Sequence, residues 1–434
     1  MISINEQPYP LPDGWQWVTM KDIATLFTGN SINKKIKVEK YFGRTDGLIY
    51  IATKDIGFDN QIDYATNIRI PASDNFKIAP TNTPLLCIEG GSAGRKIGFT
   101  NQPVCFVNKL CAFVSNKANP KLIYYFLQTQ NFAEQFTKMK HGLIGGVSIK
   151  NLTSMKFPLP PLNEQQRIVL LLDELFSKLD EAKELAQAVV DGSELRRAAI
   201  LHKAFIGELS QLWRDEHGTN LDSWQRVQLG DVCQINPPKI STRNLLDDLE
   251  VSFVPMAAVS DVRGEITVPQ RKNLREVKSG FTNFAEGDVL FAKITPCMEN
   301  GKAALVGKLV NHIGYGSTEF FVLRCGEKIL NRFVYHLVRW KIFRDEAKSV
   351  MAGAVGQQRV PKRFLTSYQL NLPPLNEQKE IVSLLDDLLG RKQRTKELAT
   401  KTLERVELMK KSILTRAFRG KLSPTEPFKG RTTH

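Results

Sequence analysis

Two segments of the chain carry hydrophobic residues at alternating spacings of four and three. The first segment places them at Ile168, Leu172, Leu175, Leu179, Ala182, Ala186 and Val189. The second begins the same way, is interrupted by Lys392 and Thr395, and resumes at Ala399, Val406, Met409 and Ile413. This spacing is typical of helices that pair in a coiled coil. We therefore predict two helices of about 40 residues, each about 60 Å long, with local irregularity in the second.

The ends of the two predicted helices carry matching signals. Each follows a pair of prolines, which end an extended strand and forbid helix at the preceding residue. An asparagine then offers an N-cap, and Gln166 adds a capping-box partner that Lys379 removes from the second copy. A glycine closes each segment. The residues are Pro160, Pro161, Asn163 and Gly207 in the first segment and Pro373, Pro374, Asn376 and Gly420 in the second.

The two segments are copies of each other. The stretch Leu-Pro-Pro-Leu-Asn-Glu-Gln occurs at Leu159–Gln165 and again at Leu372–Gln378. One offset of 213 residues aligns Leu159–Ser210 with Leu372–Ser423 without a gap, and about half of the paired positions are identical. A repeat of this length is neither a solenoid nor a propeller period. It indicates that one functional unit was doubled.

The block before each predicted helix has a mixed pattern. Short β-rich runs lie among Gly, Asn and Asp turns, and a helical pattern precedes the end of each block. The runs include Leu48–Ile51, Pro84–Ile88 and Val289–Phe291, and the helical patterns cover about 120–138 and 329–349. The blocks share this order but little sequence. We predict an α+β fold: two mixed α/β domains separated by two long helices that form an antiparallel coiled coil, as a pseudo-twofold tandem repeat.

These patterns divide the chain into five segments. We expect a first domain at residues 1–158, a first spacer helix at 159–210, a linker and second domain at 211–371, a second spacer helix at 372–423 and a C-terminal tail at 424–434.

Net charge is concentrated in the two blocks. The chain carries a formal charge of +15. Residues 1–158 hold 18 basic and 11 acidic side chains, and residues 221–371 hold 21 and 15. The helical segments differ in sign, with 6 basic and 8 acidic residues at 163–206 but 10 and 7 at 376–418. Two separate basic blocks predict two surfaces for a polyanion, of which nucleic acid is the commonest.

Bulk composition argues against several other classes of protein. The six cysteines form no Cys-x-x-Cys pair and His is scarce, so a metal site or a disulfide framework is not favoured. We find no apolar run long enough to cross a bilayer and no signal-peptide pattern, so we expect a cytoplasmic protein without a membrane partner.

Motifs that resemble catalytic sites fail on chemistry. Asn236-Pro237-Pro238 is followed by Lys239, whereas an adenine-N6 methyltransferase needs an aromatic ring there to stack the flipped base. Gly301-Lys302 lacks the other residues of a phosphate-binding loop. No credible Ser/His/Asp, Cys/His or carboxylate-cluster site is present, and we expect no catalytic residue, metal or cofactor on this chain.

Glycine-rich basic loops occur at equivalent places in the two blocks. Small residues allow close backbone approach, while Arg, Lys, Asn and Ser supply hydrogen bonds to phosphates and base edges. For any single loop, a solvated hairpin is at least as good an interpretation, but the paired sets favour DNA contact. The candidates are Asn30, Ser31, Lys34, Lys35, Ser92, Arg95, Lys96, His141 and Lys150 in the first block, and Lys239, Ser241, Arg243, Lys293, Asn300, Lys302, Gln357, Gln358 and Arg359 in the second.

The repeated motif resembles a known family. Leu-Pro-Pro-Leu-Asn-Glu-Gln-x-x-Ile-Val heads each helix, and the second helix ends Ser412-Ile413-Leu414-x-x-Ala417-Phe418-Arg419-Gly420-x-Leu422. These residues are similar to the conserved regions of the specificity subunits of Type I restriction–modification enzymes. The resemblance covers the whole chain, and the motif occurs twice at the proper spacing. The first copy departs from it at Ile206, where the second has Arg419.

The resemblance implies a role for each segment. Each block would be a target-recognition domain that reads one half of a split, asymmetric sequence in double-stranded DNA. The two helices would fix the gap between the half-sites. Two methylation subunits would dock on the chain and modify adenine N6 with S-adenosylmethionine, and two restriction subunits would translocate and cleave DNA with ATP and Mg²⁺. The chain itself would be non-catalytic.

Two other classes of function fit the residues alone. A scaffold would use the coiled coil as an adaptor and the basic blocks to bind protein. A standalone regulator would bind a bipartite DNA site without other subunits.

Overall fold

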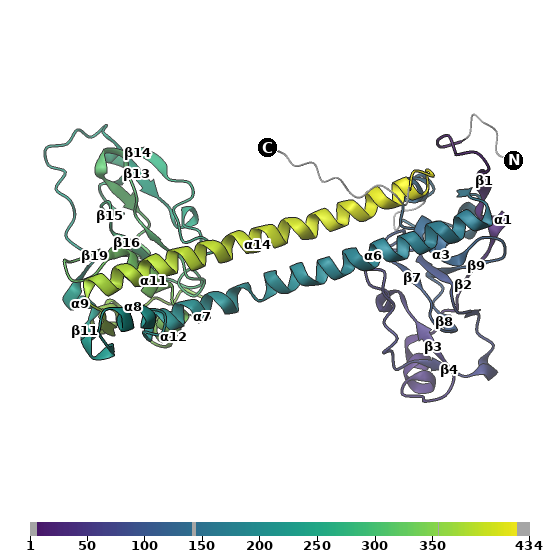
Figure 1. Ribbon diagram of the computed structural model, residues 1–434, viewed down its shortest axis with the longest axis horizontal. Helices are drawn as coiled ribbons and strands as arrows, with labels where there is room; N and C mark the ends of the chain where they lie inside the picture. Colours follow the sequence, from purple (N-terminus) through teal and green to yellow (C-terminus); the bar gives the residue numbers. More distant parts are fainter. Residues whose placement is uncertain (1–6, 141–144, 355, 423–434) are drawn as a thin grey trace. The chain divides into compact units, whose positions relative to one another are not determined.

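The computed structural model describes residues 7–140, 145–354 and 356–422 (Figure 1). The chain forms two compact units. The first combines the N-terminal 187 residues with the segment that starts at Lys401, and the second is Ala188–Thr400. The longest helix, α14 (Leu375–Ala417), contributes residues to both units. The predicted tandem of mixed α/β domains is confirmed, whereas the five segment boundaries stay a prediction.

The first unit contains two four-stranded sheets and a two-stranded ribbon. The ribbon pairs β1 (Gln16–Thr19) with β10 (Lys156–Leu159). One sheet has the order β2 (Ala24–Thr28), β9 (Leu110–Ser115), β6 (Pro84–Cys87), β7 (Ile97–Phe99). The other has the order β4 (Arg69–Ile70), β3 (Leu48–Ile51), β8 (Val104–Phe106), β5 (Ile78–Ala79), in which β3 and β8 are parallel.

The second unit repeats this topology with a different sequence. Its ribbon pairs β11 (Gln225–Gln228) with β20 (Gln369–Leu372). One sheet has the order β12 (Cys233–Ile235), β19 (Phe320–Cys325), β16 (Val289–Ala292), β17 (Ala303–Leu305). The other has the order β14 (Gln270–Asn273), β13 (Glu250–Val254), β18 (Gly314–Gly316), β15 (Thr282–Phe284), and β13 and β18 are again parallel.

We call the sheet of β2, β9, β6 and β7, and its counterpart of β12, β19, β16 and β17, the central sheet of each unit. Each central sheet is covered on both faces, which explains why its strands are continuously apolar. In the first unit Leu86 and Phe113 pack with the helices, whereas Leu85 and Ala112, one residue away, pack against the second sheet. The same alternation divides Phe291 from Leu290 in the second unit. The predicted strands at 48–51, 84–88 and 289–291 are confirmed to within one residue.

Short helices complete each unit, and two predicted helices are each divided. The pattern at 120–138 forms α3 (Pro120–Phe126) and α4 (Gln130–Lys138), because the Thr129 hydroxyl caps a new helix. The pattern at 329–349 forms α11 (Asn331–Arg339) and α12 (Lys341–Ser349), separated by Trp340 in an extended conformation. The remaining short α-helices of the described residues are α1 (Met20–Ile23), α2 (Lys34–Ile36), α5 (Ile149–Thr153), α8 (Gln211–Glu216), α9 (Leu229–Val232), α10 (Leu274–Val277) and α13 (Lys362–Ser367).

The expected irregularity lies in the first long helix instead of the second. The first copy ends α6 (Leu162–Asp191) at Gly192 and resumes as α7 (Ser193–Phe205). In the second copy α14 is continuous through Lys392 and Thr395. Glycine in a helix interior costs about 1 kcal/mol relative to alanine, and residue 405 of the second copy is Arg. Helix α14 also runs without interruption through Gly390, so neither the weakened seam nor a glycine alone breaks it.

The expected asparagine N-caps are also wrong. Helices α6 and α14 begin at Leu162 and Leu375, one residue before the asparagines. The carbonyl oxygen of Pro161 accepts the first helical bond from the Gln165 amide, and Pro374 does the same for Gln378. The asparagines consequently lie inside the first turn.

Within each unit the copies of the long helix pack side by side with opposite chain directions. In the first unit Lys183 pairs with Glu407 at 2.7 Å and Asp180 with Lys410 at 2.5 Å. The seam residues Ile168, Leu172, Ala186, Ile381, Leu385, Ala399, Val406 and Ile413 are buried. No helix among the described residues is long and apolar enough to span a membrane.

Candidate nucleic-acid interface

In each unit, two candidate loops leave the same edge of the central sheet. Strands β2 and β6 are both antiparallel to β9, so they run in the same direction. Thr28 and Leu86 both pair with Cys111, so the two strands end at nearly the same level. The loops after them carry the candidates Asn30, Ser31, Ser92, Arg95 and Lys96.

The loop after β2 divides its polar groups between structure and solvent. Asn30 accepts a bond from the Lys77 amide at 2.8 Å, and its own amide donates to Phe106 at 2.9 Å. Its side-chain oxygen is thus engaged within the fold. Ser31, Lys34 and Lys35 are exposed, and these three side chains are placed to meet a ligand from solvent.

The loop after β6 is held by its lysine and presents its arginine. The Lys96 ammonium donates to the Thr53 carbonyl at 3.2 Å. Arg95 is exposed, and both cations lie over the ring of Phe58, at 5.4 Å for Arg95 and 5.1 Å for Lys96. The Phe58 ring is 63% exposed. This aromatic residue was missed in the sequence, where its only signal is a bulky apolar side chain in a Gly-Phe-Asp turn.

The remaining candidates of the first unit lie beside this loop or beyond the described residues. His141 lies outside the described residues. The Val147 amide donates to Ile88 at 3.1 Å, which brings the start of the segment that carries Lys150 beside the loop after β6. Lys150 is exposed on α5.

The second unit repeats this arrangement with other residues. Strands β12 and β16 both run antiparallel to β19, so their loops leave the same edge. Lys302 donates to the Met256 carbonyl at 3.1 Å, as Lys96 does to Thr53. The candidates that face solvent here are Lys239, Ser241, Arg243 and Asn300.

The structure brings two distant candidate segments of the second unit together. The Thr295 amide donates to the Gln358 carbonyl at 3.0 Å, and the Val360 amide donates to Lys293 at 2.9 Å. Gln357 is exposed beside them. The Arg359 guanidinium forms three hydrogen bonds with the Glu319 carboxylate, at 2.9, 3.0 and 3.3 Å, and these hold the pKa of Glu319 below its usual range.

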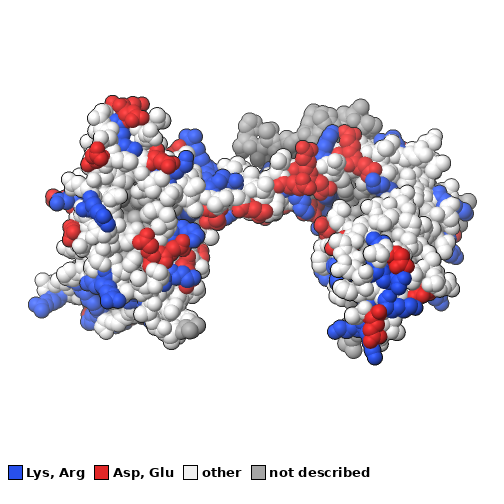
Figure 2. All heavy atoms as spheres, turned by 90° about the horizontal axis from the view of Figure 1, so that it is seen from below, with Lys and Arg blue, Asp and Glu red and all other residues white. Residues whose placement is uncertain are grey.

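The surface of these loops suits a polyanion better than a small molecule. The solvent-facing groups are cations, hydroxyls and amides on loops, which is the chemistry that contacts phosphates and base edges. Figure 2 shows Lys and Arg side chains in several groups, with Asp and Glu among them. Within residues 7–140, 145–354 and 356–422, no cluster of three His, Cys, Asp or Glu side chains could hold a metal. Contact of any candidate with DNA stays a prediction.

The repeated glutamine joins each block to its long helix. The Gln165 side chain accepts from the Asn119 amide at 2.8 Å and donates to Pro160 at 2.9 Å. Gln378 accepts from the Leu330 amide at 2.9 Å and donates to Pro373 at 2.8 Å. Each glutamine therefore ties the start of a block helix to the residues just before a long helix.

The repeated aspartate makes a second junction with different partners. Asp173 accepts from Lys121 at 2.8 Å and from the hydroxyl of Tyr125. Asp386 instead pairs with Arg332 at 2.9 Å and lies 3.0 Å from His336. Partial burial opposes ionisation of Asp386, but these two neighbours outweigh it and hold its pKa at about 2.

Comparison with known proteins identifies the family. The model of the Type I restriction modification DNA specificity domain matches residues 12–189 and again residues 222–407. The two matches together cover more than half of the chain and follow the internal repeat.

Curated relatives agree with this match. The Type I restriction enzyme EcoAI specificity subunit of Escherichia coli is 39% identical over 171 residues, a match that covers 39% of this chain but only 28% of that protein. The StySPI specificity subunit of Salmonella potsdam is 23% identical over 431 residues, covering 95% of this chain and 90% of that protein.

Solved structures support the same fold. The HsdS subunit from Thermoanaerobacter tengcongensis is 21% identical, with a TM-score of 0.61 and coverage of 96% of this chain and 100% of that one. A chain from a study of assembly and conformational transition in the type I R-M system is 19% identical, with a TM-score of 0.67 and the same coverage. We conclude that the chain belongs to the Type I restriction modification DNA specificity domain family, and the relatives that match over nearly its full length are specificity subunits.

Proposed function

We propose that this specificity subunit reads a bipartite, asymmetric target in double-stranded DNA, one half-site with each unit. The observation that carries the proposal is the doubled architecture: two sheets of identical order present loops of different sequence at equivalent edges. A repeated scaffold with unlike loops is suited to reading two unlike sequences at a fixed separation.

A domain exchange tests this proposal. Residues 1–158 are replaced by the corresponding block of another family member, and methylated sites are mapped for the assembled methyltransferase. We expect the bases of one half-site to change while the other half-site stays as it was. A change in both half-sites, or in neither, would contradict independent reading.

We also propose that the long helices form an antiparallel coiled coil on which two methylation subunits dock. Two exposed leucines recur at equivalent positions of the repeat. Leu185 and Leu398 are 66% and 65% exposed, and Leu195 and Leu408 are 77% and 64% exposed. In the first unit, Leu185 and Leu408 lie beside the ion pair between Lys183 and Glu407. In the second unit, Leu195 and Leu398 lie beside the ion pair between Glu194 and Lys396. Apolar side chains retained twice on a solvent-facing helix suit a pair of equivalent protein contacts.

Paired substitutions separate the two proposed docking sites. We expect Leu185→Glu with Leu408→Glu to release one methylation subunit, and Leu195→Glu with Leu398→Glu to release the other, as read by native mass spectrometry. Leu170→Glu is the control, because Leu170 is 70% exposed but its repeat equivalent is Ser383. Retention of both subunits by both double variants would place the docking surface elsewhere.

We place catalysis and its cofactors on the partners. S-adenosylmethionine would bind the methylation subunits, and ATP and Mg²⁺ would serve two restriction subunits. The competing classes are a protein-binding scaffold and a standalone DNA-binding regulator. A binding assay on target DNA, with and without methylation subunits, distinguishes them: a scaffold binds in neither case, and a regulator binds equally in both.

A further inference from the structure

The second unit contains a cavity lined by three arginines. It has a volume of about 300 Å³ and is bordered by Arg197 of α7, by Arg339 and Arg344 of α11 and α12, and by Asn300 and Gly301 of the loop after β16. Glu194 also lines it. Arg197 is far in sequence from Arg339 and Arg344, so only the fold brings the three charges together.

Arg339 is the most deeply buried of the three. The residue is only 3% exposed, and its guanidinium donates to the carbonyls of Asp261 at 2.9 Å and Val262 at 3.0 Å. Burial, together with the nearby charge of Arg197, lowers the pKa of this guanidinium to about 10. The guanidinium also lies 5.6 Å from the centre of the Tyr335 ring. A buried cation held by carbonyl dipoles and an aromatic ring is costly unless an anion accompanies it.

The guanidinium of Arg344, like that of Arg339, forms only some of the hydrogen bonds that it can donate. One of its terminal nitrogens donates to the Glu299 carbonyl. Among the described residues, the Nε atoms of Arg339 and Arg344 are buried and have no hydrogen-bond partner. Gly301 leaves room beside the Arg344 guanidinium, because a Cβ at this position would lie 3.3 Å from the guanidinium carbon.

The repeat shows that Arg197 lacks a carboxylate that its counterpart has. Its equivalent in the first unit, Lys410, pairs with Asp180 at 2.5 Å. The residue equivalent to Asp180 is Gln393, and Arg197 donates instead to the Val262 carbonyl at 3.3 Å. In the part of the chain that the structure describes, none of the three arginines forms an ion pair with a carboxylate.

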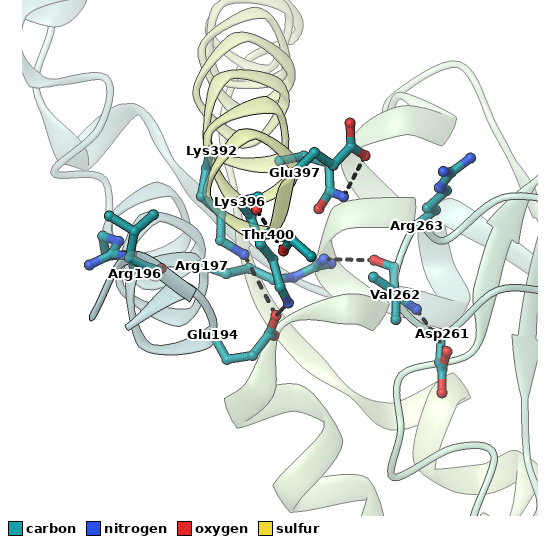
Figure 3. Close-up of polar contacts among 12 residues, drawn as sticks. Glu194, Arg196, Arg197, Asp261, Val262, Arg263, Lys392, Lys396, Glu397 and Thr400 are labelled. Carbon is teal, nitrogen blue, oxygen red and sulfur yellow. Dashed lines mark hydrogen bonds and ion pairs between the residues drawn. The ribbon is translucent and has the colours of Figure 1, made fainter. Parts of the chain in front are cut away.

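Two acidic residues, Glu194 and Asp261, line the cavity, and both are already engaged. The Asp261 carboxylate accepts from the Val262 amide at 2.9 Å. Figure 3 shows Lys392 and Lys396 directed toward Glu194 and Arg197 directed toward Val262. The Glu194 carboxylate lies 3.6 Å from Lys392 and 3.5 Å from Lys396. Two ammonium groups thus share one carboxylate, and an excess of positive charge remains around the cavity.

We propose that this cavity binds a phosphate group. Guanidinium groups match the oxygens of phosphate with paired, charge-assisted bonds, and three of them can neutralise a doubly charged tetrahedral anion. The group could be a backbone phosphate of bound DNA, since Asn300 and Gly301 belong to a candidate DNA-contact loop, or free inorganic phosphate. The site is additional to the two half-site surfaces proposed above.

Two measurements test the site and identify the source of its phosphate. The first measurement compares thermal unfolding of the full chain in 10 mM inorganic phosphate and in chloride of equal ionic strength. We assume that 10 mM phosphate is about ten times the dissociation constant. We expect phosphate to raise the midpoint by about 3 °C. Arg197→Gln and Arg344→Gln should each abolish the increase, while Lys410→Gln, the matched change in the first unit, should retain it.

The second measurement is the salt dependence of DNA binding by the assembled methyltransferase. If the source is the DNA backbone, Arg197→Gln should reduce the slope of log affinity against log salt by about one, with the methylated sequence unchanged. A phosphate-dependent increase without a change in slope identifies free phosphate. An increase retained by both arginine variants, or no effect in either measurement, would overturn the site. Loss of half-site specificity would instead concern the proposed function.

Discussion

The two units share one backbone plan but hold their long helices with different chemistry. At the repeated aspartate, the first unit uses Lys121 and Tyr125, whereas the second uses Arg332 and His336. At the repeated glutamate, Glu164 pairs with Arg167 in a partly exposed position, whereas Glu377 is buried. The glutamines beside them make equivalent bonds in both units.

This contrast separates what the fold requires from what each block supplies. The glutamine and the aspartate of the long helices are identical, and each forms a hydrogen bond at the same place in its junction with a block. The glutamate differs, because Glu164 pairs within its own helix. The block residues need only present a complementary group, and a hydroxyl, an imidazole or a guanidinium each suffices. The difference predicts that equivalent substitutions in the two units will have unequal effects.

The largest inequality is expected at the repeated glutamate. The Glu377 carboxylate accepts from Arg214 at 2.6 Å, Ser210 at 2.8 Å and Trp224 at 2.9 Å. Glu377→Ala would leave the Arg214 guanidinium buried without its anion, at a cost of about 3–5 kcal/mol. Amide hydrogen exchange, read separately on peptides from each unit, measures this loss in the second unit.

The matched variant in the first unit should have little effect. Glu164 and Arg167 have side chains that are 26% and 37% exposed. Glu164→Ala should therefore reduce the stability of the first unit by no more than about 1 kcal/mol. Equal losses in the two units would mean that burial does not govern the contrast.

The sequence predicted the elements whose signals are local. The repeat, the four-three spacing and the β-rich runs located the long helices and several strands. The N-caps were misplaced because the carbonyls of Pro161 and Pro374 begin the helices without asparagine caps. The interruption at Gly192 was missed because the seam spacing reports side chains, and a glycine alone does not mark an interruption, since α14 runs through Gly390.

Groups that meet only in the folded chain could not be predicted. Arg214 and Glu377 are 163 residues apart, and nothing near either indicates a partner. The structural role of Lys96 and Lys302 is equally hidden, since each ammonium meets a carbonyl on another strand–loop segment. Basic residues in glycine-rich loops mark the candidate surface, but composition does not tell which of them the fold itself engages.

The second unit should be the more sensitive to mild acid. Burial lowers the pKa of His336, so this imidazole stays neutral in the folded chain and gains a proton on unfolding. Stability from this group is present above the ordinary histidine pKa of about 6.5 and is lost as pH falls, by at most about 1.4 kcal/mol per pH unit. In the first unit, burial and the bond to Asp173 raise the pKa of Tyr125, so Tyr125 stays protonated across this range.

Hydrogen exchange between pH 7 and 5, corrected for its intrinsic pH dependence, tests this difference. Peptides of the second unit should lose protection relative to those of the first. His336→Gln should flatten the pH dependence of the second unit, although it lowers stability at pH 7. A dependence that persists in His336→Gln would assign the titration to another group.

The smallest inequality is expected at the interruption between α6 and α7. Gly192 has helical backbone angles, with φ of −74° and ψ of −2°, so alanine fits its conformation. Its Cβ would lie 2.6 Å from a terminal nitrogen of Arg196, which can move because it ends a flexible exposed side chain. Gly192→Ala should therefore stabilise residues 188–205 by about 0.5–1 kcal/mol. The matched change Arg405→Gly should destabilise α14 by about 1 kcal/mol. Hydrogen exchange of these two segments measures both effects, and a loss of protection in Gly192→Ala would show that the glycine is required at the interruption.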